Sequence, residues 1–340
     1  MSEKLSKNTF KLTTCPSIKA FASVVGKKEG EGPLGSQFDL VNEDTTLGME
    51  TWEKAESQLQ KDSVATALKK SGLANTQIDL LFAGDLLNQC IGSSFGLREL
   101  DIPFYGLYGA CSTMAESLGL ASIFADNGLV NNAVAVTSSH FASAERQFRF
   151  PLEYGGVRTP TAQWTVTGSG AAVVSRSDQP PYVKAVTVGK IEDLGIKDIN
   201  NMGAAMAPAA AYTIKQYLMD SKTRPEDYDA IITGDLGWVG SELLCDLLLR
   251  ENIDIRKVHN DCGKMIFDRE KQDVHAGGSG CGCSASVLCS VLLTQLQQGK
   301  LKDILFIATG ALMSPTSMQQ GESIPSIAHL VHLGNQKWPA

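Results

Sequence analysis

The sequence has no long hydrophobic run and no excess of positive charge. Its 340 residues include 30 Lys and Arg against 37 Asp and Glu, which gives a net charge of -7 at pH 7. This balance argues against nucleic acid as the main partner, because backbone phosphates repel an acidic protein. No uninterrupted apolar segment approaches the roughly 20 residues that a membrane-spanning helix needs. We therefore expect no transmembrane segment.

The first residues also lack the continuous apolar core of an export signal. Eight cysteines in a chain without such a signal are expected to be free thiols rather than a disulfide framework. Hydrophobic residues make up 43% of the chain and charged residues 20%. That composition can bury a large core and excludes the disordered class. We expect a soluble, cytosolic, compact protein.

What the chain does contain is a long internal repeat. Residues 78–86 (IDLLFAGDL) return as residues 228–236 (YDAIITGDL), and Asp79 and Asp85 are among the residues that recur at the same spacing. A period of this length is too long for a solenoid of small stacked units. The repeat predicts two similar halves.

Each half continues with a turn of small residues that opens an apolar helix, at residues 109–128 and 280–299. Both helices are expected to stop at a glycine, which readily takes the left-handed conformation that closes a helix. A strand follows each helix, at residues 133–137 and 304–308. Helices with so few polar positions are buried between layers.

This βαβαβ pattern, present twice, predicts an α/β protein in layers with the two apolar helices in the middle. We place the division between residues 1–178 and 179–340. If a pseudo-twofold axis relates the halves, the N-termini of the two helices should approach each other. Each carries a cysteine there, Cys111 in the first half and Cys281 in the second.

Cys111 is a candidate nucleophile. At the start of a helix, unpaired N–H groups and the positive end of the dipole lower the pKa of a thiol. The alternative is that Cys111 is simply a small buried residue, since free cysteine packs like a small hydrophobe. Spacing alone leaves these two interpretations evenly balanced.

A resemblance to a known superfamily covers most of the chain. Residues 108–116 (YGACSTMAE), the strand at 133–139 and the glycine-rich residues 164–174 (WTVTGSGAAVV) resemble the thiolase and ketoacyl-synthase superfamily. The resemblance implies two pseudo-twofold-related βαβαβαββ halves stacked as five αβαβα layers. It also implies a homodimer.

Condensing enzymes of that superfamily also place a histidine, with a second histidine or an asparagine, on turns of the second half. These groups move protons and stabilise the oxyanion. Here the corresponding turns read TGDLGW at residues 233–238 and GCGC at residues 280–283, without an imidazole. His140, at the end of a first-half strand, is a candidate to face the pocket, although an ordinary loop histidine is the simpler interpretation. The remaining histidines lie at positions that are less suited to face the pocket. They are His259, His275, His329 and His332.

Within the superfamily, residues 137–156, 158–170 and 260–268 resemble the stage V sporulation protein AD family of endospore-forming bacteria. That resemblance implies binding of dipicolinic acid (pyridine-2,6-dicarboxylate), or of its calcium chelate, rather than turnover. It further implies uptake of the ligand into the forespore with membrane subunits of a sporulation channel complex. The chain would then lie at the forespore inner membrane through protein contacts. Two alternatives stay open: an acyl-transferring enzyme that uses Cys111, and a structural scaffold of the channel complex.

The chemistry of such a ligand suggests further site residues. Arginine matches a carboxylate best, and Arg146, Arg149 and Arg158 lie in one connection among aromatic residues. The alternative for this connection is a solvated loop or a dimer contact. The helix N-termini at Cys111 and Cys281 would add backbone donors for a carboxylate.

Three further features have two interpretations each. Asp85 and Asp235 could address a chelated calcium ion, or they could cap the turns that follow them. Trp238 could stack in the pocket or pack in the core. Cysteines and histidine gather near residues 259–283, but their spacing departs from the paired Cys-x-x-Cys knuckles of zinc sites. We therefore predict no metal site and no cofactor.

Overall fold

The computed structural model describes residues 2–148 and 157–339. Its framework is a pair of five-stranded sheets, one from each half of the chain. The first half contributes β3 (Ser17–Gly26), β5 (Leu80–Gly84), β6 (Phe104–Leu107), β7 (Asn132–Ser139) and β9 (Gly168–Ser175). The second half contributes β10 (Tyr182–Thr187), β11 (Ala230–Thr233), β12 (His259–Asp261), β14 (Asp303–Ala311) and β15 (Ser326–Gly334).

The two sheets have the same topology. Their strand orders are β6-β5-β7-β9-β3 and β12-β11-β14-β15-β10. In both, the last strand but one, β9 or β15, runs antiparallel to each of its neighbours, and the other neighbouring pairs are parallel. The sheets join where β3 and β10 meet at a single pair, Ser17 with Tyr182. The predicted repeat is thus a repeat of topology as well as of sequence.

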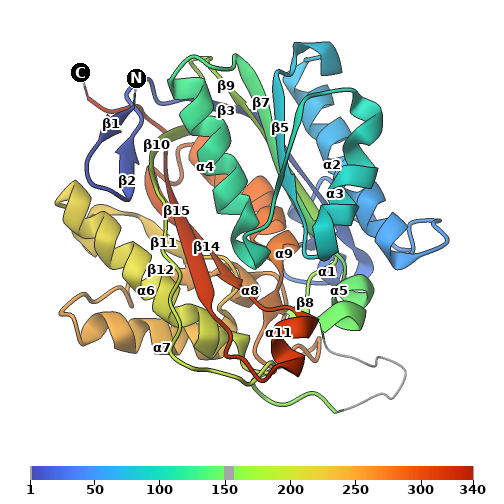
Figure 1. The fold of residues 1–340 in the computed structure, drawn as a ribbon. Helices are drawn as coiled ribbons and strands as arrows, with labels where there is room; N and C mark the ends of the chain where they lie inside the picture. Colours follow the sequence, from blue (N-terminus) through green and yellow to red (C-terminus); the bar gives the residue numbers. More distant parts are fainter. Residues whose placement is uncertain (1, 149–156, 340) are drawn as a thin grey trace.

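Helices complete five layers, as the sequence predicts (Figure 1). α2 (Trp52–Ser71) covers the outer face of the first sheet, and α6 (Met202–Ser221), with α7 (Gly237–Leu249) beside it, covers the second. Between the sheets lie α4 (Thr113–Asp126) and a second central helix. The second central helix consists of α9 (Cys281–Val287), a π-helical turn (Leu288–Leu292) and α10 (Leu293–Gln297).

The remaining elements are short. Five short strands lie outside the two main sheets or at their margins. They are β1 (Glu3–Lys4), β2 (Thr9–Lys11), β4 (Leu40–Asn42), β8 (Trp164–Thr165) and β13 (Gly278–Ser279), and β8 pairs with β13. The short helices are α1 (Lys27–Gly30), α3 (Ile91–Leu97), α5 (Phe141–Phe148), α8 (Cys262–Met265) and α11 (Pro315–Gln319). The pairing of β8 with β13 links the two halves directly. Both ends of the chain lie at one corner of the molecule, beside β1 and β2 (Figure 1).

The central helices end as the sequence predicts. Gly128 follows α4 with φ +74°, and Gly299 follows α10 with φ +70°, so both occupy the left-handed region that favours glycine. Both helices are buried on nearly every side, because a sheet covers each of two opposite faces. Leu118 of the first and Leu292 of the second are 0% and 2% exposed.

One local expectation needs correction. Arg146 does not lie in a connection but in the last turns of α5, which continues to Phe148. The division at residues 178 and 179 falls between β9 and β10, and it stays a prediction.

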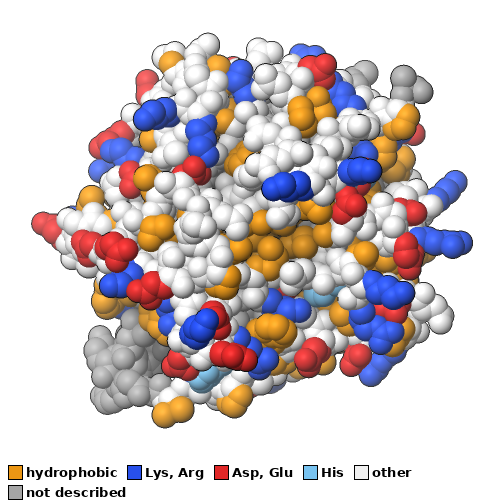
Figure 2. All heavy atoms as spheres, turned by 180° about the vertical axis from the view of Figure 1, so that it is seen from behind, with side chains coloured by type: hydrophobic (Ala, Val, Ile, Leu, Met, Phe, Trp, Pro, Cys, Tyr) orange, Lys and Arg blue, Asp and Glu red, His pale blue; other side chains and the backbone are white. Residues whose placement is uncertain are grey.

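The surface charges bear on nucleic acid as a partner, and the apolar character of the helices bears on the membrane. Figure 2 shows positive and negative side chains interspersed over one face of the molecule, with hydrophobic side chains gathered near its centre. Among residues 2–148 and 157–339, no helix combines the length and apolar character needed to cross a membrane.

Candidate functional site

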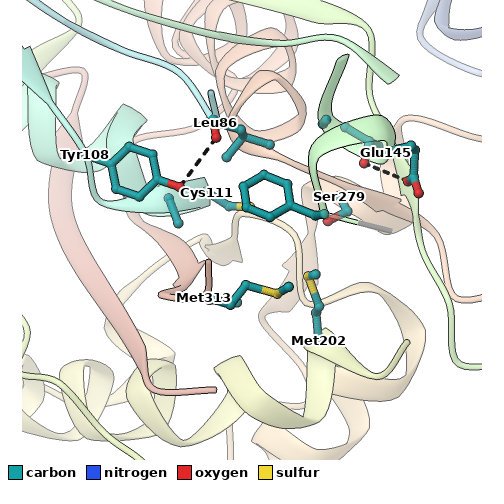
Figure 3. Close-up of a pocket in the computed structure, with 12 residues that line it drawn as sticks. Leu86, Tyr108, Cys111, Glu145, Met202, Ser279 and Met313 are labelled. Atoms are coloured by element: carbon teal, nitrogen blue, oxygen red, sulfur yellow. Dashed lines mark hydrogen bonds between the residues drawn. The ribbon is translucent and has the colours of Figure 1, made fainter. Parts of the chain in front are cut away.

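A small cavity lies where the N-terminal ends of the two central helices meet (Figure 3). We call it the inner cavity. Its lining comes from both halves and consists of Leu86, Tyr108, Ala110, Cys111, Ala144, Glu145, Phe148, Thr165, Met202, Ser279, Ala311 and Met313. Met202 and Met313 point into it from the side opposite Cys111 (Figure 3). Its free volume is about 30 Å³, enough for about two water molecules.

Cys111 sits at one wall of this cavity. It lies in the 3₁₀ turn Ala110–Ser112 that leads directly into α4, and Ala110 before it has φ +49°. The side chain is 6% exposed. The carboxylate of Asp235, which comes from the second half of the chain, lies close enough to this thiol to act on its pKa.

Asp235 follows β11 and is completely buried. Its Oδ2 accepts the Gly280 N–H at 2.8 Å, and its Oδ1 accepts the Thr309 hydroxyl at 2.7 Å. Burial raises the pKa of Asp235 to about 6, although these donors and the Cys111 thiol act in the opposite direction. The carboxylate therefore contacts the start of the second central helix and lies near Cys111.

The predicted lowering of the Cys111 pKa is wrong. Burial raises the pKa of the Cys111 thiol well above its ordinary value, and the negative charge of Asp235 raises it further. The backbone of Gly280 acts in the other direction but is a smaller influence. A helix start lowers a thiol pKa only where a buried carboxylate does not oppose it.

Cys281 lies close to Cys111 at the start of α9. The two cysteines belong to one small cluster with Leu86 and Ala144, and the charge of Cys281 contributes to the raised pKa of Cys111. Its own Sγ donates a hydrogen bond to the Ser138 carbonyl oxygen at 2.8 Å. The two helix starts thus meet as the repeat predicts.

Asp85, the counterpart of Asp235, caps its own turn. Its Oδ1 accepts the Leu87 N–H at 2.9 Å, and its Oδ2 accepts the Ser93 N–H at 2.7 Å. The capping interpretation is therefore confirmed for Asp85. In the second half Asp261 performs this task, since it accepts the N–H groups of Leu236 and Gly237, each at 2.9 Å.

None of the five histidines lines the inner cavity. His140 is buried, and its Nε2 donates to the Thr45 carbonyl oxygen at 2.7 Å while its Nδ1 accepts the Ala142 N–H at 3.2 Å. Burial lowers the pKa of His140, so the ring is a neutral, satisfied part of the structure. The rings of the other four form hydrogen bonds outside the cavity. His259 pairs with Thr233, His275 with Thr159, His329 with Gly189, and His332 with Tyr217 and Asp303.

Arg146, one of the predicted arginines, reaches a hollow near the cavity. It lines a larger neighbouring space, which we call the outer cleft, of about 890 Å³. There it forms an ion pair with Glu53 and lies 5.3 Å from the ring of Trp52. The cleft is lined by Glu53, Leu87, Asn88, Gln89, Ile91, Ser143, Arg146, Gln147, Phe148, Ile199, Pro315, Met318 and Gln319.

Two other predicted ligand contacts, Arg158 and Trp238, line neither space. Arg158 lies 4.7 Å from the Trp164 ring and forms an ion pair with Asp273 at 3.7 Å. Trp238 lies within α7, beside the ammonium group of Lys264 at 4.7 Å. Arg149 lies outside the described residues. A part for these three residues in binding stays a prediction.

Several cavity residues were not predicted. Glu145, Thr165, Met202, Ser279 and Met313 come from segments that are far apart in the sequence. Thr165 Oγ1 donates to Glu145 Oε1 at 3.1 Å, which joins α5 to β8. Ser279 directly precedes the small-residue turn at residues 280–283, and this position was a signal in the sequence. The methionines belong to no recognisable pattern.

The described residues contain no group of three or more His, Cys, Asp or Glu side chains arranged to hold a metal ion. The cysteines at positions 262, 281 and 283 are all buried free thiols. Burial lowers the pKa of nearby His259 to about 4.

Solved structures with a similar fold include a 3-oxoacyl-[acyl-carrier-protein] synthase and OleA. 3-Oxoacyl-[acyl-carrier-protein] synthase III from Aquifex aeolicus is 14% identical, with a TM-score of 0.56 over 94% of this chain and 99% of its own. OleA from Xanthomonas campestris is 15% identical, with a TM-score of 0.59 over 95% of this chain and 99% of its own. At such identities the likeness establishes a shared fold alone.

Closer similarity comes from sequence. The family model for stage V sporulation protein AD matches residues 6–334. Stage V sporulation protein AD of Bacillus subtilis is 49% identical over 312 residues, which cover 92% of each chain. A sporulation protein and a condensing-enzyme fold are thus combined in one molecule, and the chain belongs to the stage V sporulation protein AD family.

Proposed function

We propose that this protein binds dipicolinic acid, as the free dicarboxylate or as its calcium chelate, and supports its uptake into the forespore. The observation that carries the proposal is the burial of the Cys111 thiol beside the buried carboxylate of Asp235. A condensing enzyme needs a thiolate and a base that accepts its proton. Here burial and the carboxylate both raise the pKa of the thiol. A thiol held in this way keeps its proton at neutral pH, which favours binding over covalent chemistry.

The two neighbouring spaces supply the groups that such a ligand needs. A flat aromatic ring requires apolar walls, and Leu86, Met202 and Met313 provide them in the inner cavity. A carboxylate requires a donor, and the guanidinium of Arg146 in the outer cleft is held in place by Glu53. The inner cavity would thus bind the ring of the ligand, and the adjoining outer cleft would bind a carboxylate.

Calorimetry with dipicolinate, with and without calcium, tests the proposal directly. Arg146→Gln should weaken binding by about tenfold or more, because a hydrogen bond to a charged group contributes about 1.5–3 kcal/mol. Arg256→Gln is the matched control, since Arg256 is an exposed arginine paired with Asp254 at 2.6 Å. A wild-type protein that binds no ring dicarboxylate would overturn the proposal.

Acyl transfer is the second candidate function. Cys111 precedes a central helix in a fold shared with 3-oxoacyl synthases, and this placement favours it. Incubation with acyl-CoA thioesters followed by intact mass measurement decides between the two. An acyl adduct that disappears in Cys111→Ala would support an enzyme. A third candidate, a structural scaffold, predicts that changes in the inner cavity leave dipicolinate uptake unaltered.

We also propose two protein partners. Membrane subunits of the sporulation channel complex would hold the protein at the forespore inner membrane, where it would also serve spore germination. A second copy of the chain would pair through β6, the outermost strand of the first sheet. Phe104 and Tyr105 on this edge are 39% and 51% exposed, and an open edge with aromatic side chains favours pairing. Sedimentation at micromolar concentration that finds only monomer would contradict the homodimer.

A further inference from the structure

The side chain of Phe148 separates the inner cavity from the outer cleft. It is part of the lining of both spaces. It is half-buried and packs against the cluster of Leu86, Cys111, Ala144 and Cys281. One aromatic ring therefore forms the boundary between a space that is nearly full and a space that is largely open.

The inner cavity is too small for a ring dicarboxylate as long as Phe148 stays in place. Its free volume of about 30 Å³ holds about two water molecules. The opposite wall consists of the flexible thioether side chains of Met202 and Met313, which adapt well to the shape of a neighbouring group. Removal of the Phe148 ring would leave a space with the shape of a flat six-membered ring.

We propose that Phe148 occupies the place of the ligand's ring and turns into the outer cleft when the ligand binds. This inference rests on the proposed function and assigns the site to a flat, six-membered aromatic ring that carries carboxylates. The outer cleft, with about 890 Å³, has room for the displaced phenyl group. The exchange replaces one aromatic ring with another between the same apolar walls, so little packing is lost.

The polar groups around this ring position define which edge of a ligand is recognised. The hydroxyl groups of Tyr108, Thr165 and Ser279 line the same cavity. Their protein partners are the Leu86 carbonyl oxygen at 3.4 Å, Glu145 Oε1 at 3.1 Å and Asp235 Oδ2 at 3.4 Å. The two contacts of 3.4 Å are long for O–H donors, whose usual distance is about 2.7–2.8 Å. Tyr108 and Ser279 are therefore well placed to redirect their hydroxyls to a carboxylate.

Alkylation of Cys111 tests the position of Phe148 without any ligand. Phe148→Ala should open the cavity to the cleft and raise the rate at which iodoacetamide labels Cys111, measured by peptide mass spectrometry, by about tenfold or more. Phe124→Ala is the matched control, because Phe124 is a partly buried phenylalanine that packs between Phe82 and Tyr105 instead. Phe148→Leu is the milder variant if the alanine variant does not fold. An unchanged Cys111 labelling rate in both folded variants would overturn the inference.

Ligand binding supplies the second readout. Phe148→Ala removes the need to displace a side chain, so its affinity for dipicolinate should rise at least threefold over that of the wild type. Benzene-1,3-dicarboxylate should bind both proteins, and glutarate, which carries two carboxylates but no ring, should bind neither. Equal affinities of wild type and Phe148→Ala would overturn the exchange of rings. If no dicarboxylate binds while Cys111 labelling still rises, the proposed function fails but the boundary formed by Phe148 stands.

Discussion

Two pairs of aspartates recur between the halves, and only one pair keeps its role. Asp79 Oδ2 accepts the N–H groups of Asn131 and Asn132 at 2.6 and 3.1 Å. Asp229 Oδ2 accepts those of Lys302 and Asp303 at the same two distances. Both aspartates precede a strand and fix the start of the next parallel strand. Here the repeat is conserved down to its hydrogen bonds.

The second pair has diverged. Asp85 caps the turn after β5, whereas Asp235 after β11 accepts the Gly280 N–H and lies near the Cys111 thiol of the other half. The reason lies on the neighbouring strand. Thr233 pairs with Asp261 on β12, but its counterpart Ala83 pairs with Gly106 on β6. Because Asp261 caps the turn of the second half, Asp235 is released to the site between the halves.

The largest expected effects come from the central helices, which should respond alike in both halves. Leu118→Ala and Leu292→Ala should each lower the free energy of unfolding by about 2–5 kcal/mol, because each leaves a cavity in a fully packed layer. Denaturant unfolding followed by circular dichroism measures this. A change near zero at either position would show that the two layers are not packed equivalently.

The next effect separates Asp235 from Asp85. Burial raises the pKa of Asp235 from 3.8 to about 6, so its contribution to stability is fully present below about pH 4 and is lost as the pH rises through 6. The asparagine in Asp235→Asn does not ionise. Relative to the wild type, the variant should therefore gain stability between pH 4 and 8, by about 3 kcal/mol at most.

Unfolding of the wild type and Asp235→Asn at several pH values provides the measurement. Asp85→Asn is the control at the symmetric position. Both oxygens of Asp85 accept backbone N–H groups, and asparagine has a single oxygen, so one of these groups loses its acceptor. The variant should therefore be destabilised by the lost bond, although burial also raises the pKa of Asp85. A difference between Asp235→Asn and wild type that does not change with pH would contradict the raised pKa.

A smaller effect concerns the reactivity of Cys111. Asp235 raises the pKa of this thiol by its charge. Asp235→Asn should increase the rate of Cys111 alkylation at pH 8 severalfold, because a larger fraction of the thiol is ionised. The rate at Cys90, which lies near Asp85 instead, is the internal reference. An unchanged alkylation rate at Cys111 would show that Asp235 does not control the ionisation of this thiol. It would also remove the main support for a binding role.

The fold was largely predictable because its signals are local and repeated. Residues 78–86 and 228–236 mark equivalent strands, and Gly128 and Gly299 mark equivalent helix ends. The site was less predictable, since identical Gly-Asp-Leu tripeptides put Asp85 and Asp235 to different uses. That choice depends on Asp261, a residue on another strand. Phe148 and Met202 meet only through the packing of the two halves, so no spacing in the sequence reports it.

The smallest expected difference is between Asp79→Ala and Asp229→Ala. Each variant removes an exposed carboxylate that accepts two backbone N–H groups, so each should cost about 1 kcal/mol. The two losses should agree within about 0.5 kcal/mol, because the contacts match in number and distance. Chemical unfolding of both variants under one set of conditions makes the comparison. Unequal losses would mean that the halves differ in stability even where their hydrogen bonds are the same, and the divergence would then extend beyond the site around Cys111.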